Sequence, residues 1–517
     1  MLYRLRELEH RVLVVEKGSG VGGTWYWNRY PGARCDVASM EYSYQFDDQL
    51  QREWNWSERY SPQPEILRYA NHVTDRFQLR PHIQFDATVV SASYEEHNNT
   101  WLVDTENSTG EKRTRSTTYL VAATGCLSSP NQPSISGLDQ FRGEIYHTGQ
   151  WPQEPIDFSG RRVGVIGTGS SGIQAIPVIA EQAKHLTVFQ RTANYAVPAR
   201  NKPMPAEERD YFRENYADLR KQATTTRNGQ LTPPNPVSAL AVDGEEREKQ
   251  YEARWQKGGL AFIGSFNDLI VNDDSNKTAA DFVKEKIRKT VKDRSTAEKL
   301  LPKSKIGCKR LCVDSGYYET YNRSNVSLID ISETPIEVVQ PDGIRVRGNT
   351  IELDAIVLAT GYDAMTGALI NMNITGRDGV TLAQSWKEGP KTFMGIAIHG
   401  YPNLFTITGP GSPSVLTNML PTIEQHVNLL TDILQHAQSM NQDKIEATLE
   451  AQESWVEHVN AIASKTIYPT CNSWYLGSNV PGKPRVFMPY VGFPSYVKHC
   501  EEMVSDGYAG LSFTKSE

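Results

Sequence analysis

The amino-acid sequence predicts an α/β fold, because short buried strands alternate with helices along much of the chain. Two aliphatic runs, at 119–125 and 355–361, have the length of buried strands and end in the same Ala-Thr-Gly turn. A further run at 162–166 is followed by a glycine-rich turn, a helical stretch at 173–183 and another strand at 186–189. This order is a complete βαβ unit, which is typical of a parallel sheet.

The remaining segments extend this prediction. Apolar residues at helical spacing in Leu2–Leu8 predict a helix, and the β-branched run at 12–15 predicts the strand that follows it. Residues 200–307 carry long charged stretches, which predict an all-helical insertion, and another helix is expected near 421–435. A chain of 517 residues is long enough for two or three packed units.

Composition excludes several functional classes. The net charge is −7, and acidic and basic residues are interspersed, so no basic face indicates nucleic acid. No apolar run approaches the roughly 20 residues that cross a bilayer, and the N-terminus lacks a signal peptide's apolar core, which predicts a cytoplasmic protein without a membrane span. The six cysteines are scattered without neighbouring histidine ligands, so we expect free thiols and no metal site.

The glycine-rich turn after 162–166 has the spacing of a phosphate-binding loop. Its first two glycines allow the backbone to approach a pyrophosphate, and the third allows the next helix to pack closely on the sheet. A Rossmann-like dinucleotide-binding domain is the prediction, and a purely structural glycine turn is the alternative. The residues of this loop are Gly167, Thr168, Gly169, Ser170, Ser171 and Gly172.

The charge at the end of each nucleotide strand predicts which nucleotide it binds. Arg191 and Thr192 follow the strand at 186–189, and an arginine there can pair with a 2′-phosphate, so NADPH is expected; a surface arginine is the alternative. Glu16 ends the strand at 12–15 and suits a ribose with free hydroxyls, as in the ADP part of FAD. Two nucleotide sites of different kinds predict a flavin reductase or oxygenase rather than a simple dehydrogenase.

Two motifs carry a resemblance to a known family. Residues 141–152 read FRGEIYHTGQWP and fit the FxGxxxHxxxWP fingerprint of Baeyer–Villiger monooxygenases at every fixed position. Residues 22–36, GGTWYWNRYPGARCD, resemble the flavin-side motif of the same family. The resemblance covers essentially the whole chain and is nearest to the phenylacetone and steroid monooxygenase branch. It implies an FAD- and NADPH-dependent enzyme that inserts one O₂-derived oxygen next to a ketone carbonyl, through a C4a-peroxyflavin, and gives an ester or lactone.

The resemblance also implies roles for individual residues. Arg310 is expected to be the active-site arginine near the flavin, held by Asp36, because a fixed guanidinium stabilises the negative charge that develops during oxygen transfer. Without the resemblance, both would be interpreted as ordinary surface charges. Lys309 is expected to help Arg191 hold the 2′-phosphate. His147 is expected to be an essential conformational residue between domains rather than a base.

The remaining expected site residues fall into two groups. Trp474 resembles a mobile-loop tryptophan that closes over the nicotinamide, with a core aromatic as the alternative. The cofactor-binding candidates on the flavin side are Glu16, Gly23, Thr24, Trp25 and Asp36. The expected substrate pocket is lined by Ser414, Val415, Leu416 and Met419. Its apolar members predict a bulky hydrophobic ketone as the partner of O₂, and no oligomeric state is predicted.

The resemblance divides the chain into three parts. Residues 1–126 and 364–517 are expected to form the FAD-binding domain, and 127–199 and 308–363 the NADPH-binding domain, with 200–307 as the insertion. The first βα unit of the FAD domain, with its own GxGxxG, is expected just before the start of this sequence and is missing from it, so we expect weak FAD binding.

Two other functions stay open at this point. One is an N- or S-oxygenating flavin monooxygenase, against which the Trp151-Pro152 ending and the Asp36/Arg310 pair count. The other is a non-catalytic NADPH-binding remnant, because the intact phosphate loop is the one expected to bind NADPH.

Overall fold

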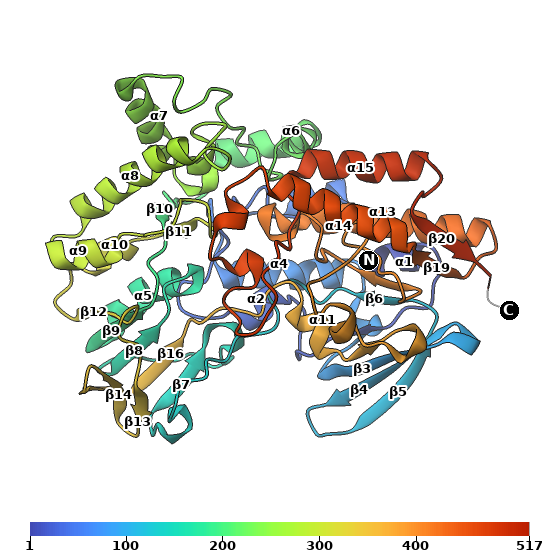
Figure 1. The fold of residues 1–517 in the computed structure, drawn as a ribbon, viewed down its shortest axis with the longest axis horizontal. Helices are drawn as coiled ribbons and strands as arrows, with labels where there is room; N and C mark the ends of the chain where they lie inside the picture. The colour runs from blue at the N-terminus through green and yellow to red at the C-terminus, as the bar shows by residue number, and fades with distance from the viewer. Residues whose placement is uncertain (516–517) are drawn as a thin grey trace.

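The computed structural model describes residues 1–515 and confirms the α/β prediction (Figure 1). Its largest sheet has five parallel strands in the order β12-β9-β8-β16-β7. These strands are β7 (Glu144–His147), β8 (Arg162–Ile166), β9 (His185–Gln190), β12 (Val326–Asp330) and β16 (Ala355–Leu358). The predicted βαβ unit is confirmed, since helix α5 (Ser170–Gln182) connects the paired strands β8 and β9.

Both faces of this sheet are buried, as a parallel sheet requires. Val163 and Val165 of β8 point to one face and pack in a core with Ile173 and Ile176 of α5. Ile166 packs on the other face against an antiparallel meander. The meander comprises β13 (Val338–Gln340), β14 (Gly343–Val346) and β15 (Asn349–Glu352). We call the five-stranded sheet, α5 and the meander the main-sheet unit.

A second region carries its parallel strands in two separate pairs. Strand β1 (Val14–Val15) pairs with β2 (Ile83–Gln84), and β6 (Leu120–Ala122) pairs with β18 (Leu404–Thr406). Within residues 1–515, no strand joins the two pairs into one sheet. A sheet in the order β17-β3-β4-β5 adjoins them. Its strands are β3 (Ala87–Glu95), β4 (Thr100–Asn107), β5 (Lys112–Thr117) and β17 (Ile374–Thr375). We call this region, with its helices, the split-sheet unit.

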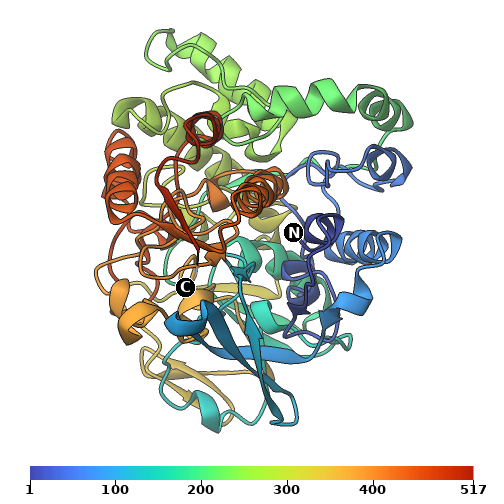
Figure 2. The same ribbon diagram turned by 90° about the vertical axis from the view of Figure 1, so that its right-hand side faces the viewer.

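Helices stabilise the split-sheet unit from both ends of the sequence. Figure 2 shows α1 (Leu2–Glu7) beside the C-terminal helices, and Leu5 shares a core with Val427, Leu430 and Tyr496. The C-terminal elements are α13 (Met419–Ser439), β19 (Lys444–Ala447), α14 (Leu449–Ala463), α15 (Phe493–Ser505) and β20 (Leu511–Thr514). The other helices here are α2 (Thr24–Trp27), α3 (Asp48–Glu53), α4 (Gln63–Arg76), α11 (Gly367–Asn371) and α12 (Leu382–Ser385).

Residues 200–307 form helices, as the charged pattern predicts. Asp243, Asn272 and Asp293 each cap a helix by accepting a backbone N–H in its first turn. These helices are α6 (Ala206–Thr224), α7 (Gly244–Lys257), α8 (Asp273–Thr290) and α9 (Arg294–Leu300). Short elements on either side join them to the main-sheet unit: β10 (Ala196–Pro198), β11 (Cys312–Asp314) and α10 (Tyr317–Thr320). Among residues 1–515, no helix combines the length and apolar character needed to cross a membrane.

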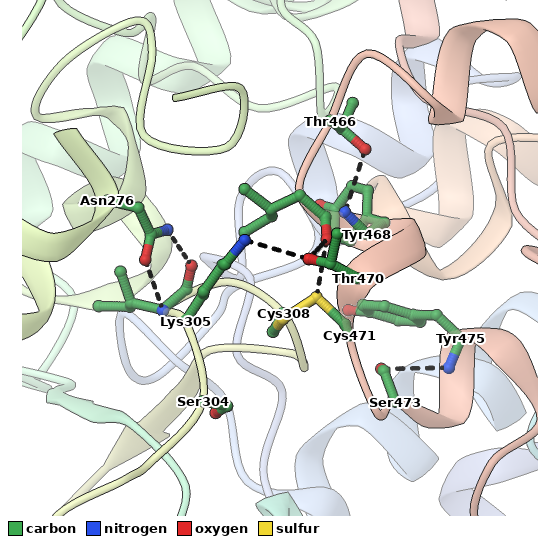
Figure 3. Close-up of a disulfide and its surroundings, with 12 residues drawn as sticks. Asn276, Ser304, Lys305, Cys308, Thr466, Tyr468, Thr470, Cys471, Ser473 and Tyr475 are labelled. Atoms are coloured by element: carbon green, nitrogen blue, oxygen red, sulfur yellow. Dashed lines mark hydrogen bonds between the residues drawn. A yellow bond between two sulfur atoms is a disulfide. The ribbon is translucent and has the colours of Figure 1, made fainter. Parts of the chain in front are cut away.

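The prediction of free thiols is wrong for two of the six cysteines. Cys308 and Cys471 form a disulfide with a Cα–Cα distance of 5.5 Å (Figure 3). They are 163 residues apart, so no local spacing could indicate that the fold brings them together. Cys35, Cys126, Cys312 and Cys500 are free and buried.

Candidate active site

The phosphate loop of the main-sheet unit needs its glycines. Gly167 has φ +108°, and a Cβ there would lie 2.4 Å from the carbonyl oxygen of Ala359. A Cβ at Gly172 would lie 2.3 Å from the carbonyl oxygen of Gly167, whereas one at Gly169 would meet open space. Within the described residues, no side chain caps the N-terminus of α5. The loop therefore presents open backbone and free N–H groups, and it fits a nucleotide pyrophosphate.

Serine and threonine side chains complete this loop. Thr168 is buried, and its hydroxyl donates to the carbonyl of Thr192 at 2.9 Å, which ties the loop to the end of β9. Ser170 begins α5 and contacts the Cys312 sulfur at 3.4 Å, and Ser171 follows it in the first turn.

Two cations meet beyond the end of β9. Arg191 is exposed, and Lys309 is half-buried beside it. Burial is the main cause that lowers the pKa of Lys309, and the positive charge of Arg191 lowers it further. Two basic side chains that repel each other across a shared space fit a dianionic phosphate between them. The structure thus brings together two residues that are 118 positions apart in the sequence, as the resemblance implies.

The flavin-side motif lies in the split-sheet unit. Glu16 follows β1, its carboxylate accepts from the N–H of Gly18 at 2.7 Å, and burial raises its pKa. Gly23 begins α2 with φ +51°, and a Cβ there would meet open space; Thr24 beside it is exposed. The Trp25 indole donates to the hydroxyl of Tyr42 at 3.1 Å. A surface hollow of about 660 Å³ lies beside this motif, and its lining includes Arg29, Gln63, Leu67 and Arg68.

Arg310 and Asp36 form a bidentate ion pair that connects the two units. The guanidinium Nε and Nη2 donate to the two carboxylate oxygens at 2.6 and 2.7 Å, and Nη1 donates to the carbonyl of Val415 at 2.8 Å. Burial alone would lower the pKa of Arg310, but the charge and hydrogen bonds of Asp36 outweigh it and raise the pKa above its ordinary value. Arg310 is therefore a permanent, fixed cation.

The expected substrate residues and the loop tryptophan lie in one apolar cluster beside Arg310. Val415 is buried there with Met365 and Tyr475, and Leu416, Met419 and Trp474 pack against the same cluster. Ser414 is buried, and its hydroxyl lies 3.5 Å from the Met365 sulfur. The cluster gives the Arg310 cation an apolar neighbourhood, in which its field is screened less than in water.

The fingerprint segment at 141–152 lies at a junction between the two units. A Cβ at Gly143 would lie 2.4 Å from the carbonyl of Asp354, so the chain can pass there only with glycine. Trp151 is buried against Tyr146, and its N–H donates to the carbonyl of Trp27 in the flavin-side motif at 3.3 Å. The fingerprint therefore contacts both units.

Both ring nitrogens of His147 are occupied by hydrogen bonds. Nδ1 accepts from the N–H of Gly149 at 3.0 Å, so Nε2 carries the proton and faces the Thr360 hydroxyl at 3.2 Å. Thr360 in turn donates to the carbonyl of Asn131 at 2.7 Å. Burial lowers the pKa of His147, which keeps it neutral. This arrangement holds the Ala-Thr-Gly turn after β16 and suits a conformational role better than a base.

Four further residues belong to this site, and the sequence analysis missed them. Thr360 orients His147, the Tyr362 hydroxyl donates to the side chain of Asn28, and Lys483 pairs with Asp363. Tyr475 is buried next to Arg310. Thr360 and Tyr362 lie at the end of a strand that the sequence predicts, and this position could have indicated that they belong to the site. Nothing local in the sequence indicates the pairing of Lys483 with Asp363 or the place of Tyr475.

Comparison with known proteins agrees with this geometry. The family model described as pyridine nucleotide-disulphide oxidoreductase matches residues 3–222. A Baeyer–Villiger monooxygenase of Pseudooceanicola batsensis is 41% identical over 500 residues, which cover 96% of this chain and 90% of that protein. A solved structure of an oxidized steroid monooxygenase bound to NADP is 48% identical with a TM-score of 0.94, covering 99% of this chain and 97% of that one.

A second solved structure supports both cofactors. The complex of OTEMO with FAD and NADP is 38% identical with a TM-score of 0.95, and it covers 99% of this chain and 96% of that one. These relatives extend over nearly the whole chain, and the two solved structures contain NADP, one of them together with FAD. The chain therefore belongs to the Baeyer–Villiger monooxygenases, the flavoproteins that work with FAD and NADPH.

Proposed function

We propose that this chain inserts one O₂-derived oxygen atom next to the carbonyl of a bulky hydrophobic ketone, in the cytoplasm, and releases an ester or lactone. The observation that carries the proposal is the Arg310 cation, fixed by Asp36 beside the apolar cluster around Val415. A simple dehydrogenase needs no such cation, whereas a reaction that builds negative charge on oxygen does.

We assign one nucleotide to each unit. FAD binds the split-sheet unit, formed by 1–126 and 364–517, where Glu16 faces the ribose and Gly23 leaves room for the cofactor. NADPH binds the main-sheet unit, formed by 127–199 and 308–363, with Arg191 and Lys309 on its 2′-phosphate. When bound, NADPH supplies a hydride and the reduced flavin reacts with O₂.

The residues of the chain create the setting for that chemistry. Arg310 stays charged throughout, so its guanidinium stabilises the negative charge that appears on the ketone oxygen without having to reorient. Its hydrogen bond to the Val415 carbonyl fixes the position of the substrate loop relative to this charge. His147 keeps the Ala-Thr-Gly turn in place between the units, and Trp474 shields the nicotinamide from water.

The substrate is assigned by the character of the pocket. Ser414 contributes a hydroxyl, while Val415, Leu416 and Met419 contribute apolar surface, which favours a large ketone with few polar groups. The relative described as a steroid monooxygenase supports this class, and a steroid ketone is therefore a suitable probe.

The test uses the purified chain with excess FAD. We expect a flavin spectrum, NADPH consumption that rises when a steroid or aryl ketone is added, and an ester or lactone product by mass spectrometry. A colourless protein that consumes no NADPH would instead identify a nucleotide-binding remnant. An amine that is converted to its N-oxide, with the ketone unchanged, would identify an N-oxygenating enzyme.

A further inference from the structure

The Cys308–Cys471 disulfide joins two segments that carry proposed site residues (Figure 3). Cys308 directly precedes Lys309 and Arg310, and Cys471 lies three positions before Trp474. Both cysteines are buried in the apolar cluster around Val415. The disulfide is therefore a covalent link between the segment that positions the cation and the loop that covers it.

The segment 471–488, here called the cover loop, is otherwise attached by contacts that can break. At its far end the Lys483 ammonium pairs with Asp363, and the Asn479 amide donates to the carbonyl of Tyr362 at 2.7 Å. At its near end Lys305 donates to the hydroxyl of Thr470 at 3.1 Å. The cover loop contains no α-helix or strand, and its backbone bond to a neighbouring segment is the one that the N–H of Gly411 donates to the carbonyl of Met488 at 2.7 Å, so non-covalent contacts hold it.

Both redox states of this pair fit the site. The Cys471 sulfur lies 3.1 Å from the carbonyl oxygen of Ile467, which can accept a hydrogen bond from a reduced thiol. Cys308 lies in apolar surroundings, where a reduced cysteine packs as a small hydrophobic residue.

We propose that Cys308 and Cys471 form a reversible redox site that tethers the cover loop when oxidised and releases it when reduced. The oxidant is a hydroperoxide. One thiolate attacks the peroxide, breaks its O–O bond and becomes a sulfenic acid, and the second thiolate displaces water from that sulfur. Overall, two thiols and H₂O₂ give one disulfide and two waters, and a dithiol restores the thiols by exchange.

The tether acts on exchange of the nicotinamide nucleotide. With the disulfide formed, the cover loop stays beside Arg310, so the nucleotide enters and leaves slowly and turnover falls several-fold. With the pair reduced, non-covalent contacts alone hold the loop: the polar ones at Lys483 and Asn479, and the packing of Tyr475, Phe487 and Met488 in the apolar cluster. This consequence for turnover rests on the proposed function, but the chemistry of the pair does not.

Thiol counting tests the chemistry without any activity assay. The chain is treated with H₂O₂ or with dithiothreitol, denatured and alkylated, and its mass is then measured by mass spectrometry. We expect four alkylated cysteines after peroxide, corresponding to Cys35, Cys126, Cys312 and Cys500, and all six after dithiothreitol. Six alkylated cysteines after peroxide would overturn the proposal.

Limited trypsin digestion and turnover test the tether. Cleavage after Arg485, within the cover loop, should be several-fold faster in the reduced chain and in Cys471→Ser than in the oxidised wild type. The control Cys500→Ser, which alters a buried cysteine of α15, should be cleaved at the wild-type rate. Equal cleavage and equal turnover in both redox states would show a purely structural disulfide and refute the switch. If Cys471→Ser fails to fold, the reduced wild-type chain still gives the result.

A chain that oxidises no ketone yet shows the expected thiol counts and cleavage would contradict the proposed function alone.

Discussion

The two nucleotide-binding units are held together by different means. In the main-sheet unit, five parallel strands share continuous hydrogen-bond ladders, and cores on both faces fix the phosphate loop. In the split-sheet unit, the parallel strands form the separate pairs β1–β2 and β6–β18 beside the sheet β17-β3-β4-β5, and helices α1, α4 and α13 supply much of the packing. The phosphate loop therefore follows a strand of a continuous parallel sheet, whereas the flavin-side motif follows a strand of a separate pair.

This difference indicates which substitutions each site should tolerate least. Substitutions that disturb the backbone should damage the NADPH site, where Gly167 and Gly172 have no room for a Cβ. The FAD site should depend on side-chain contacts that cross between the units, above all on the Asp36–Arg310 pair. Weak FAD binding stays a prediction.

The largest effect is expected from removing the cation that bridges the units. Arg310→Ala should lower the rate of ketone oxygenation by about 10²–10³-fold, the usual cost of losing one fixed donor to a developing oxyanion. NADPH oxidation without ketone should fall much less. Product formation and NADPH consumption, measured side by side, give the ratio.

Arg288→Ala is the matched control, because Arg288 is an exposed arginine paired only with Glu285 and Glu298. Its rates should equal those of the wild type. If Arg310→Ala kept full oxygenation activity, the Asp36–Arg310 ion pair would have a structural role only.

A pair of glycine substitutions compares the two units directly. Gly172→Ala places a Cβ 2.3 Å from the Gly167 carbonyl and should weaken NADPH binding at least about tenfold, since roughly 1.4 kcal/mol gives that factor. A Cβ at Gly23 meets no protein atom, so Gly23→Ala should leave NADPH affinity unchanged; it should cost about 1–2 kcal/mol of stability through its positive φ and crowd the proposed FAD site. Nucleotide titration and thermal unfolding of both variants separate the effects. Equal loss of NADPH affinity in the two would refute the contrast.

Arg191→Ala should change nucleotide preference. Loss of a charge-assisted contact to the 2′-phosphate costs about 1.5–3 kcal/mol, so NADPH affinity should fall about 10–100-fold while NADH affinity changes little. The ratio of kcat/KM for the two nucleotides measures this. An unchanged ratio would place the 2′-phosphate elsewhere.

The smallest effect is a pH response that differs between the two units. In the split-sheet unit, burial lowers the pKa of His426 from 6.5 to about 4, so falling pH through that window protonates the unfolded chain first and reduces stability. Burial raises the pKa of Glu424 in the same helix from 4.5 to about 7, so its protonation in the folded chain has the opposite effect. In the main-sheet unit, burial raises the pKa of Asp314 from 3.8 to about 6, so falling pH from 6 to 4 protonates the folded chain first and increases stability.

Hydrogen exchange between pH 7 and 4 can resolve this difference. After correction for the intrinsic exchange rate, protection should increase around α10, where the Tyr317 N–H donates to Asp314, whereas the effects of His426 and Glu424 should oppose each other in α13. His426→Gln should leave only the effect of Glu424 and so increase the protection of α13 at low pH. An α13 response that is unchanged in His426→Gln would contradict the assignment.

The sequence alone determined the features whose chemistry lies in contiguous residues. The strand, glycine turn and helix at 162–183 were predictable because loop and helix are local, and each glycine acts on its immediate neighbours. The fingerprint at 141–152 and the charge types of Glu16 and Arg191 were predictable for the same reason. The strand predicted at 12–15 is confirmed at 14 and 15 only, where it pairs with β2.

Only the tertiary structure decided which distant side chains meet. Arg310 and Asp36 are 274 positions apart, and the residue types alone indicate surface charges; only the family resemblance predicted their pairing. The disulfide of Cys308 and Cys471, the contact of His147 with Thr360 and the pairing of Lys483 with Asp363 had no sequence signal. Such contacts depend on how whole elements pack against one another, and no local propensity encodes that packing.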